Sequence, residues 1–172
     1  AYLLGAVERG NFPKEAMSRT KLMISGGDRL NPNLHEQALQ LVGKDIMEGY
    51  GLTETSPVVA VNSSYATHRP GTVGPLIGGY EWRLRTREGQ PATEDEGVLW
   101  LRGASVTRGY FRAPELTAER FDGDWFNTGD YVRIEDGYIR ILDRVTDIII
   151  VGGFNVYPQE GENALAEHPD VQ

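Results

Sequence analysis

The chain has 172 residues and a formal net charge of −8, an acidic balance that argues against broad nucleic-acid binding. Its length suits one domain or two small ones, and a composition of 40% hydrophobic and 24% charged residues excludes extensive disorder. The absence of cysteine excludes a disulfide scaffold, a thiol nucleophile and a cysteine-ligated metal, and no apolar run approaches the roughly 18 residues of a membrane-spanning helix.

The first segment, residues 1–66, alternates between helical and strand patterns. Its apolar start predicts a helix over residues 1–8 that ends near Gly10. A short apolar run at residues 22–24 leads into Ser25-Gly26-Gly27, which predicts a buried strand followed by a turn.

The next helix is expected to begin at Asn31-Pro32, a good N-cap with proline in the first turn, and to end at Gly43. One face of this helix is apolar, at Leu34, Ala38, Leu41 and Val42. Residues 46–47 predict a second short strand, which the glycines of Gly49-Tyr50-Gly51 are expected to break. A strand, a helix and a strand at this spacing predict a parallel crossover, the end of a larger α/β subdomain.

The second segment, residues 67–142, has the two-residue period of strands. Alternating residues at 82–85 and 98–101 predict two strands, and a short helix is expected over residues 114–121. The strongest local signal is Asp136-Gly137 between two alternating runs, which predicts a hairpin. The segment therefore predicts an antiparallel, barrel-like β subdomain.

The third segment, residues 143–172, predicts a strand over 147–151, a turn at Gly152-Gly153 and a helix over 158–166. About 30 residues are too few to form an independent core, so the segment is interpreted as the start of a small α+β domain whose remainder lies outside the chain. The predicted fold class is mixed α/β (α+β).

Two glycine loops of the first segment follow its two predicted strands, where ligands of parallel sheets bind. Thr53 offers a hydroxyl and an N–H group to a phosphate, and Glu54 offers the hard oxygen that Mg²⁺ prefers. Taken alone, Gly26-Gly27 is more often a plain turn, and a Thr-Glu pair is as often the cap of a helix.

Three further signals each have an ordinary explanation when taken alone: Asn127-Thr128-Gly129-Asp130 as a turn, Asp143-Arg144 as a surface ion pair, and residues 152–155 as a bend after a strand. The three histidines show no metal-ligand spacing and are expected to be surface or packing residues.

In combination these blocks are far more specific than any of them alone. The chain resembles the adenylate-forming superfamily of AMP-binding enzymes (class I), and within it the fatty-acyl-CoA synthetases that act on long or medium chains. The resemblance covers nearly the whole chain from about residue 22, and its ordered blocks are 25–27, 50–54, 69–74, 109–115, 125–130, 143–144 and 152–158.

The resemblance implies that Gly26, Gly27 and Asp28 border the adenine of ATP or AMP, that Tyr50 stacks on the adenine or borders it, and that Gly51 lies near the adenylate and acyl group. Four of these residues would therefore border the base, and Gly51 would face the adenylate and the acyl group.

It further implies three catalytic residues, with Thr53 on the phosphate, Glu54 as the Mg²⁺ ligand and Arg144 reaching the ribose and phosphate. Asp130 would accept hydrogen bonds from both ribose hydroxyls, a task that suits an acceptor-only carboxylate. Gly152-Gly153 would lie near the path of the coenzyme A pantetheine.

The implied activity joins a fatty acid to ATP as an acyl-adenylate, with release of pyrophosphate, and transfers the acyl group to coenzyme A. The implied partners are these small molecules, with no nucleic acid and no transmembrane segment. Peripheral contact with a membrane and the oligomeric state stay open, and the lack of cysteine and of a signal-peptide pattern favours the cytoplasm.

The family's phosphate loop and its C-terminal catalytic lysine have no counterpart in the chain, which is therefore expected to be a fragment that is inactive alone. Thr146 stands at the family's hinge position, where aspartate or lysine is usual, and Gly161 replaces a large aliphatic residue. Two alternatives stay open: a ligase for another acid or acceptor (an aromatic acid, an amino acid or an acyl carrier protein), and a non-catalytic binding module.

Overall fold

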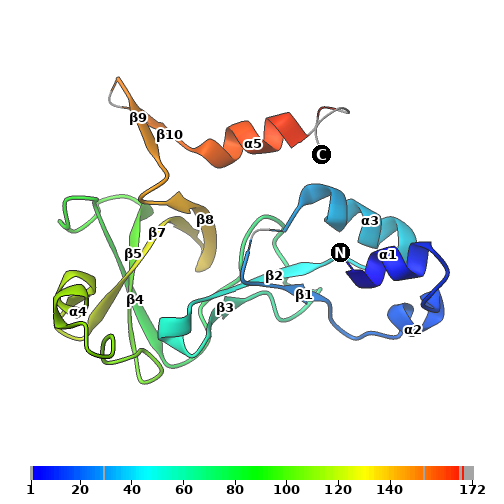
Figure 1. Cartoon of the computed structure of the whole chain (residues 1–172), viewed down its shortest axis with the longest axis horizontal. Coiled ribbons are helices and arrows are strands. Elements are labelled where there is room, and N and C mark those ends of the chain that lie inside the picture. The colour runs from blue at the N-terminus through cyan, green and yellow to red at the C-terminus, as the bar shows by residue number, and fades with distance from the viewer. Residues whose placement is uncertain (1, 29, 153, 167, 169–172) are drawn as a thin grey trace. The chain divides into compact units, whose positions relative to one another are not determined.

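A computed structural model describes residues 2–28, 30–152, 154–166 and 168, which form two compact units, Ala1–Ile77 and Gly78–Gln172 (Figure 1). The division into segments 1–66, 67–142 and 143–172 stays a prediction. No helix among the described residues is long and apolar enough to cross a membrane.

The first unit contains a helical layer and a small sheet. Its elements are α1 (Tyr2–Glu8), α2 (Lys14–Ser18), β1 (Ile24–Ser25), α3 (Pro32–Val42), β2 (Met47–Gly51), the 3₁₀ turn η1 (Thr53–Thr55) and β3 (Val58–Val61). The strand order is β1-β2-β3, with β1 parallel and β3 antiparallel to β2. The predicted parallel crossover β1-α3-β2 is confirmed.

The ends of α3 form as the sequence predicts. The Asn31 side chain accepts a hydrogen bond from the Asn33 N–H at 2.8 Å, and Gly43 ends the helix with φ 68°. The apolar face of α3 packs against α1 and α2, where a buried cluster contains Leu4, Val7, Met17, Ala38 and Val42. This cluster is the core of the helical layer.

The expectation of a buried strand at residues 22–24 is wrong. The paired strand β1 is Ile24–Ser25, and Leu22 and Ile24 are 41% and 50% exposed. Met23 packs against the helical core, and since side chains alternate along an extended chain, its two neighbours point to the other face. Among the described residues β1 pairs with β2 alone, which leaves its other flank open.

The expectation that glycines break the second strand is also wrong, because Gly49-Tyr50-Gly51 lies inside β2. The absence of a side chain lets other backbone approach: a Cβ atom at Gly51 would overlap the carbonyl of Pro57. β3, which pairs with these glycines, was not predicted. Glycine therefore permits close strand packing here.

A buried polar contact closes the loop after β3. The Asn62 side chain is buried and donates to Thr72 O at 2.6 Å. Gly74 has φ +86°, and a Cβ atom there would overlap the backbone at Val61 and Asn62. The loop 62–74 is therefore held against β3 by a backbone approach that only glycine allows.

The substitution Gly74→Ala is expected to lower the free energy of unfolding by about 2 kcal/mol or more, because it adds both overlap and an unfavourable φ. Denaturant unfolding of the protein measures this change. Gly78→Ala, at a position with open space around the added methyl, should change it by less than about 0.5 kcal/mol. Equal effects of the two substitutions would contradict the assignment.

The second unit is built on an antiparallel sheet. Its elements are β4 (Tyr80–Arg85), β5 (Glu96–Gly103), α4 (Pro114–Arg120), β6 (Phe121–Asp122), β7 (Trp125–Glu135), β8 (Tyr138–Arg144), β9 (Ile149–Val151), β10 (Phe154–Val156) and α5 (Pro158–Ala166). The sheet order is β4-β5-β7-β6, and β8 also pairs with β7, which gives a curled half-barrel. The predicted antiparallel, barrel-like architecture is confirmed, as is the mixed α+β fold class.

Local predictions for this unit also agree closely. The turn between β7 and β8 places Asp136 at φ 50° and Gly137 at φ 80°, the two positive angles that a type I′ hairpin requires. The helix expected over 114–121 is α4, whose last residue is Arg120. One face of the sheet is a core of buried side chains: Leu99, Leu101, Phe126, Val132 and Ile139.

The other face of the sheet carries a stack of arginines and tryptophans. The Arg83 guanidinium lies 4.3 Å from the Trp125 ring, and that of Arg85 lies 4.5 Å from the Trp100 ring. Both guanidinium groups donate to one Asp122 oxygen, at 3.0 and 2.5 Å. The hydrogen bonds from Arg85 and then Arg83 lower the pKa of Asp122 below its ordinary value.

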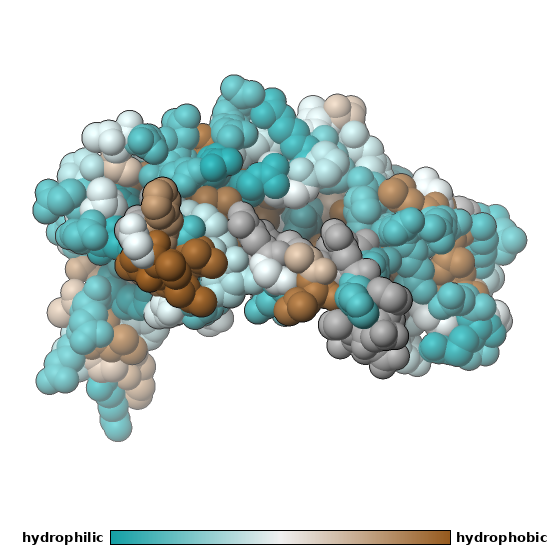
Figure 2. Space-filling model, turned by 90° about the horizontal axis from the view of Figure 1, so that it is seen from above, coloured by the Kyte–Doolittle hydropathy of each residue, from teal (hydrophilic) through white to brown (hydrophobic). Residues whose placement is uncertain are grey.

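The segment after β8 forms a hairpin and a helix. Strand β9 is shorter than the predicted 147–151, β10 was not predicted, and α5 covers the predicted helix, with Gly161 inside it. Side chains of both strands are exposed, among them Ile150 at 64% and Phe154 at 77%. They form the brown cluster over β9 and β10 in Figure 2.

The substitution Asp122→Asn is expected to lower the melting temperature at pH 7, because the two arginines stabilise the charged carboxylate. A lowered pKa contributes stability above the ordinary value of 3.8, and this contribution is lost as the pH falls through the lower folded-state value. The difference in Tm between variant and unmutated protein should therefore shrink below about pH 4. Asp124→Asn, in the turn between β6 and β7, is the control, and a pH-independent difference at Asp122 would contradict the prediction.

Candidate functional site

The loop after β2 presents Thr53 and Glu54 on a single 3₁₀ turn, η1. The loop is closed at its base, where the Leu52 N–H donates to Pro57 O at 2.9 Å. Thr53 is exposed and Glu54 is half-buried, whereas Thr55 is completely buried beneath them. The turn therefore offers a hydroxyl and a carboxylate on adjacent residues.

The loop after β1 lies at the same end of the sheet, because β1 and β2 are parallel. A Cβ atom at Gly26 would lie 3.2 Å from Gly49 O, and Gly27 has φ +93°. Asp28 follows as an exposed residue. The fold thus brings Gly26, Gly27 and Asp28 to the edge at which β2 delivers Tyr50, Gly51 and Thr53.

The second unit carries Asp130 and Arg144 as a cross-strand pair. Asp130 in β7 lies opposite Arg144 in β8, and Arg144 Nε is 3.7 Å from Asp130 Oδ1. The Asp130 side chain is 6% exposed and that of Arg144 68%, so a buried acceptor stands beside an accessible cation. This pair suits a ligand that has hydroxyl groups next to negative charge.

Two side chains shape the backbone that holds Asp130. The Asn127 side-chain oxygen Oδ1 accepts from the Gly129 N–H at 2.9 Å, and Gly129 has φ 78°. The Thr128 hydroxyl donates to Leu99 O at 2.8 Å and accepts from the Asp130 N–H at 3.1 Å. Asn127, Thr128 and Thr55 were given no individual role from sequence. Local side-chain turns at Asn and Thr are the signal that could have identified the first two.

Gly152 lies in the turn between β9 and β10, with φ 58° and open space around it. That geometry is sufficient for a plain turn. Gly153 lies outside the described residues. A role of either glycine in binding pantetheine stays a prediction.

The sequence-predicted site residues are therefore divided between the units. Gly26, Gly27, Asp28, Tyr50, Gly51, Thr53 and Glu54 belong to the first unit, and Asp130, Arg144 and Gly152 belong to the second. The first set lies on and after β1 and β2, whereas Asp130 and Arg144 form a cross-strand pair and Gly152 lies in the turn of the separate β9–β10 hairpin.

No group of three or more His, Asp or Glu side chains is arranged to hold a metal ion, among the residues whose placement is described. His35 and His68 instead both contact Asp45, with Nδ1–oxygen distances of 2.7 and 3.1 Å. A half-buried carboxylate such as Glu54 fits Mg²⁺, which takes one or two protein carboxylates and completes its shell with phosphate oxygens and water.

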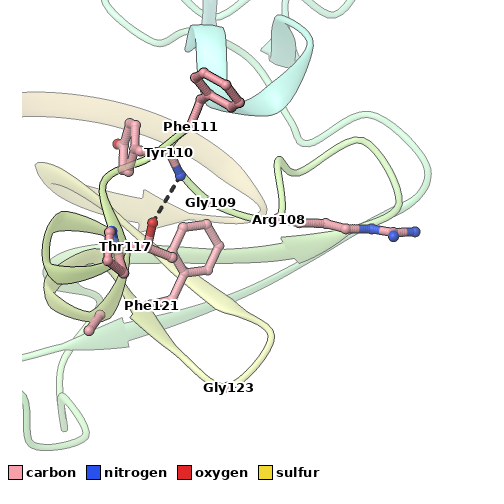
Figure 3. Close-up of a pocket in the computed structure, with 9 residues that line it drawn as sticks. Arg108, Gly109, Tyr110, Phe111, Thr117, Phe121 and Gly123 are labelled. Atoms are coloured by element: carbon pink, nitrogen blue, oxygen red, sulfur yellow. Dashed lines mark hydrogen bonds between the residues drawn. The ribbon is translucent and has the colours of Figure 1, made fainter.

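A shallow, open pocket lies at α4, and none of its lining residues is a predicted site residue (Figure 3). Its wall includes Tyr110, Phe111 and Phe121, and Figure 3 shows the Arg108 side chain extending away from these rings. The Tyr110 N–H donates to the Thr117 hydroxyl at 2.9 Å, which ties the preceding loop to α4. The block at 109–115 thus has a structural role in anchoring this helix.

Many known proteins are similar to the chain, among them the following three. Over 156 residues the chain is 39% identical to the long-chain-fatty-acid–CoA ligase of Yersinia pestis, covering 90% of this chain and 28% of the relative. It is 38% identical over 154 residues to the 2-succinylbenzoate–CoA ligase of Geobacillus kaustophilus, covering 88% of this chain and 31% of the relative. The crystal structure of ATP-bound MatB from Rhodopseudomonas palustris matches with a TM-score of 0.81 at 32% identity, over 98% of this chain and 37% of that chain.

The chain therefore spans less than a third of the length of these two curated relatives. The family model for AMP-binding enzymes matches residues 2–111, which is more than half of the chain. The match includes both glycine loops and η1. The chain belongs to the family of AMP-binding enzymes.

Proposed function

We propose that the protein carrying this chain is an ATP-dependent acid–thiol ligase that activates a fatty acid and transfers it to coenzyme A. The observation that carries the proposal is the tight turn η1, which presents Thr53 and Glu54 at the carboxyl end of parallel strands in an AMP-binding enzyme. The ligase names of its relatives supply the reaction class.

In the first half-reaction a carboxylate oxygen attacks the α-phosphorus of ATP, and pyrophosphate leaves with the bonding electrons. In the second, the thiol sulfur attacks the carbonyl carbon of the acyl-adenylate, AMP leaves, and the thiol gives up its proton. Both reactants of the first step are anions, so the site must neutralise charge and align groups more than it must move protons. This need agrees with the absence of an acid–base triad among the predicted residues.

The first unit would hold the nucleotide through its glycine loops and η1. Gly26, Gly27 and Asp28 border the adenine, Tyr50 packs against it, and Gly51 leaves room for the adenylate. Both loops contain glycines at this edge of the sheet, and because these glycines have no side chain a flat ring can approach the backbone closely.

Catalysis in this unit depends on Thr53 and Glu54. Thr53 donates from its exposed hydroxyl to a phosphate oxygen, and Glu54 places its carboxylate for Mg²⁺. When bound, Mg²⁺ neutralises phosphate charge.

The second unit would hold the sugar and the α-phosphate. Asp130 accepts from the two ribose hydroxyls, and its burial strengthens these bonds because water does not compete for the carboxylate. Arg144 is mostly exposed, so its guanidinium can reach the phosphate and stabilise the charge that develops there. Gly152 and Gly153 would lie along the path of the pantetheine.

Two classes of acid substrate are considered in this proposal. The long-chain and the 2-succinylbenzoate ligases are almost equally similar to the chain, so these residues do not separate a fatty acid from an aromatic dicarboxylic acid. We further propose that the protein works in the cytoplasm on small molecules alone.

The full-length protein is expected to release pyrophosphate from ATP·Mg²⁺ with one class of acid, and to form a thioester when coenzyme A is added. The measurement compares short, medium, long and aromatic acids, each with and without coenzyme A. A long-chain preference supports the fatty acid, and a preference for an aromatic acid supports the second candidate. A rate of pyrophosphate release that does not depend on coenzyme A, with no thioester formed, would indicate another acceptor. A folded protein inactive with every acid would favour a non-catalytic module.

The substitution Asp130→Ala is expected to reduce adenylation at low ATP by tenfold or more, because bonds from the ribose to a charged acceptor are lost, and each tenfold corresponds to about 1.4 kcal/mol. The specific readout is the preference for ATP over 2′-deoxy-ATP, which should fall in the variant. Asp124→Ala is the surface control and should keep both rate and preference. An unchanged preference in a folded Asp130→Ala variant would contradict the assigned role.

A further inference from the structure

The Thr55 side chain lies under η1, where it is completely buried. Its Oγ1 atom accepts from the Leu52 N–H at 3.0 Å and lies 2.9 Å from Leu52 O and 2.7 Å from Pro57 O. One hydroxyl therefore meets the residue that enters the turn and a residue that leaves it. It joins the two ends of the loop that presents Thr53 and Glu54.

The backbone of this loop contains a residue in a strained conformation, which hydrogen bonds within the loop help to hold. Ser56 adopts φ 59° and ψ 62°, a left-handed conformation that costs a side-chain-bearing residue free energy. At the same place the chain returns so closely that the Pro57 carbonyl occupies the space of a Cβ at Gly51. Without bonds inside the loop, residues 52–57 would relax away from this tight return.

Packing alone does not account for the residue at position 55. A valine has the same shape and apolar character, but it cannot accept from the Leu52 N–H or donate to a carbonyl. Both carbonyls also accept backbone N–H groups, Pro57 O from Leu52 and Leu52 O from Thr55, so the buried hydroxyl supplies additional bonds to the same two groups. The hydroxyl is therefore the functional part of this side chain.

We propose that Thr55 is a positioning residue, whose buried hydroxyl fixes the turn on which Thr53 and Glu54 meet the triphosphate and its Mg²⁺. The inference rests on the proposed function, because one of its measurements is the affinity for ATP·Mg²⁺. It adds a residue that touches neither nucleotide nor metal and acts through the backbone of residues 52–57.

The test compares Thr55→Val and Thr55→Ser in the full-length protein with a matched control, Thr72→Val. Thr72 is also a buried threonine of the first unit, and its hydroxyl lies 2.7 Å from Arg69 O within a local turn. Amide hydrogen exchange of a peptide spanning residues 50–58 reports on the loop. Titration with ATP·Mg²⁺ gives Kd, and initial rates give KM and kcat.

Thr55→Val should speed exchange of the Leu52 and Thr55 amides and raise the Kd for ATP·Mg²⁺ by about tenfold, the effect of one lost hydrogen bond of average strength. KM for the acid should not change. Thr55→Ser should restore protection and bring Kd within about threefold of the unmutated value, and Thr72→Val should leave both at that value.

Unchanged exchange at residues 50–58 in Thr55→Val would overturn the inference, whatever happens to activity. A loosened loop with unchanged Kd would overturn it as well, because the turn would then not need to be fixed. If Thr72→Val raises Kd equally, the effect is general destabilisation and the inference fails. If the loop loosens as expected but the unmutated protein binds no ATP·Mg²⁺, the proposed function falls, while the structural part of the inference is supported.

Discussion

The parallel pairing of β1 with β2 is the constraint on which the first unit depends. Ile24 pairs with Met47 and Ser25 with Glu48, so the two strands point the same way and end together. That arrangement requires α3 to cross between them, and α3 packs back on α1 and α2 through its apolar face. Because both strands end at one edge, residues more than 20 positions apart in the sequence supply one set of loops there. Every proposed contact of this unit with a nucleotide depends on that edge.

In the second unit, β7 has the same importance, since it pairs with β5, β6 and β8. The register of this pairing shifts at Val98–Trp100 and at Tyr131–Val132. The Thr128–Asp130 stretch lies within the first of these irregularities, between the pairs Trp100–Asn127 and Val98–Tyr131, and its side chains supply local hydrogen bonds there. The result is a buried carboxylate held by backbone geometry beside an exposed arginine.

Local signals predicted many elements well. The Asn31 cap, the Gly43 terminus and the Asp136-Gly137 hairpin each depend on one or two residues whose conformational preferences are strong. The failures have a different origin. Gly49 and Gly51 were interpreted as strand breakers, because sequence does not show that β3 and Pro57 come close to them. Leu22 and Ile24 were expected to be buried because they belong to an apolar run. The run does not reveal that its strand forms the edge of the described sheet, and this is why the expectation failed.

The sequence by itself determined the family, the mixed α+β class and the identity of the candidate residues. Ordered motifs and helix caps depend only on which residue types stand at which positions, so they can be recognised without the structure. The tertiary structure decided how each candidate is held. Thr55 carries no visible mark in the sequence, yet burial turns its hydroxyl into the link between Leu52 and Pro57. Asp130 became a buried acceptor only because β5, β7 and β8 pair around it. Burial and close backbone approach arise from long-range packing, which no local pattern of residues encodes.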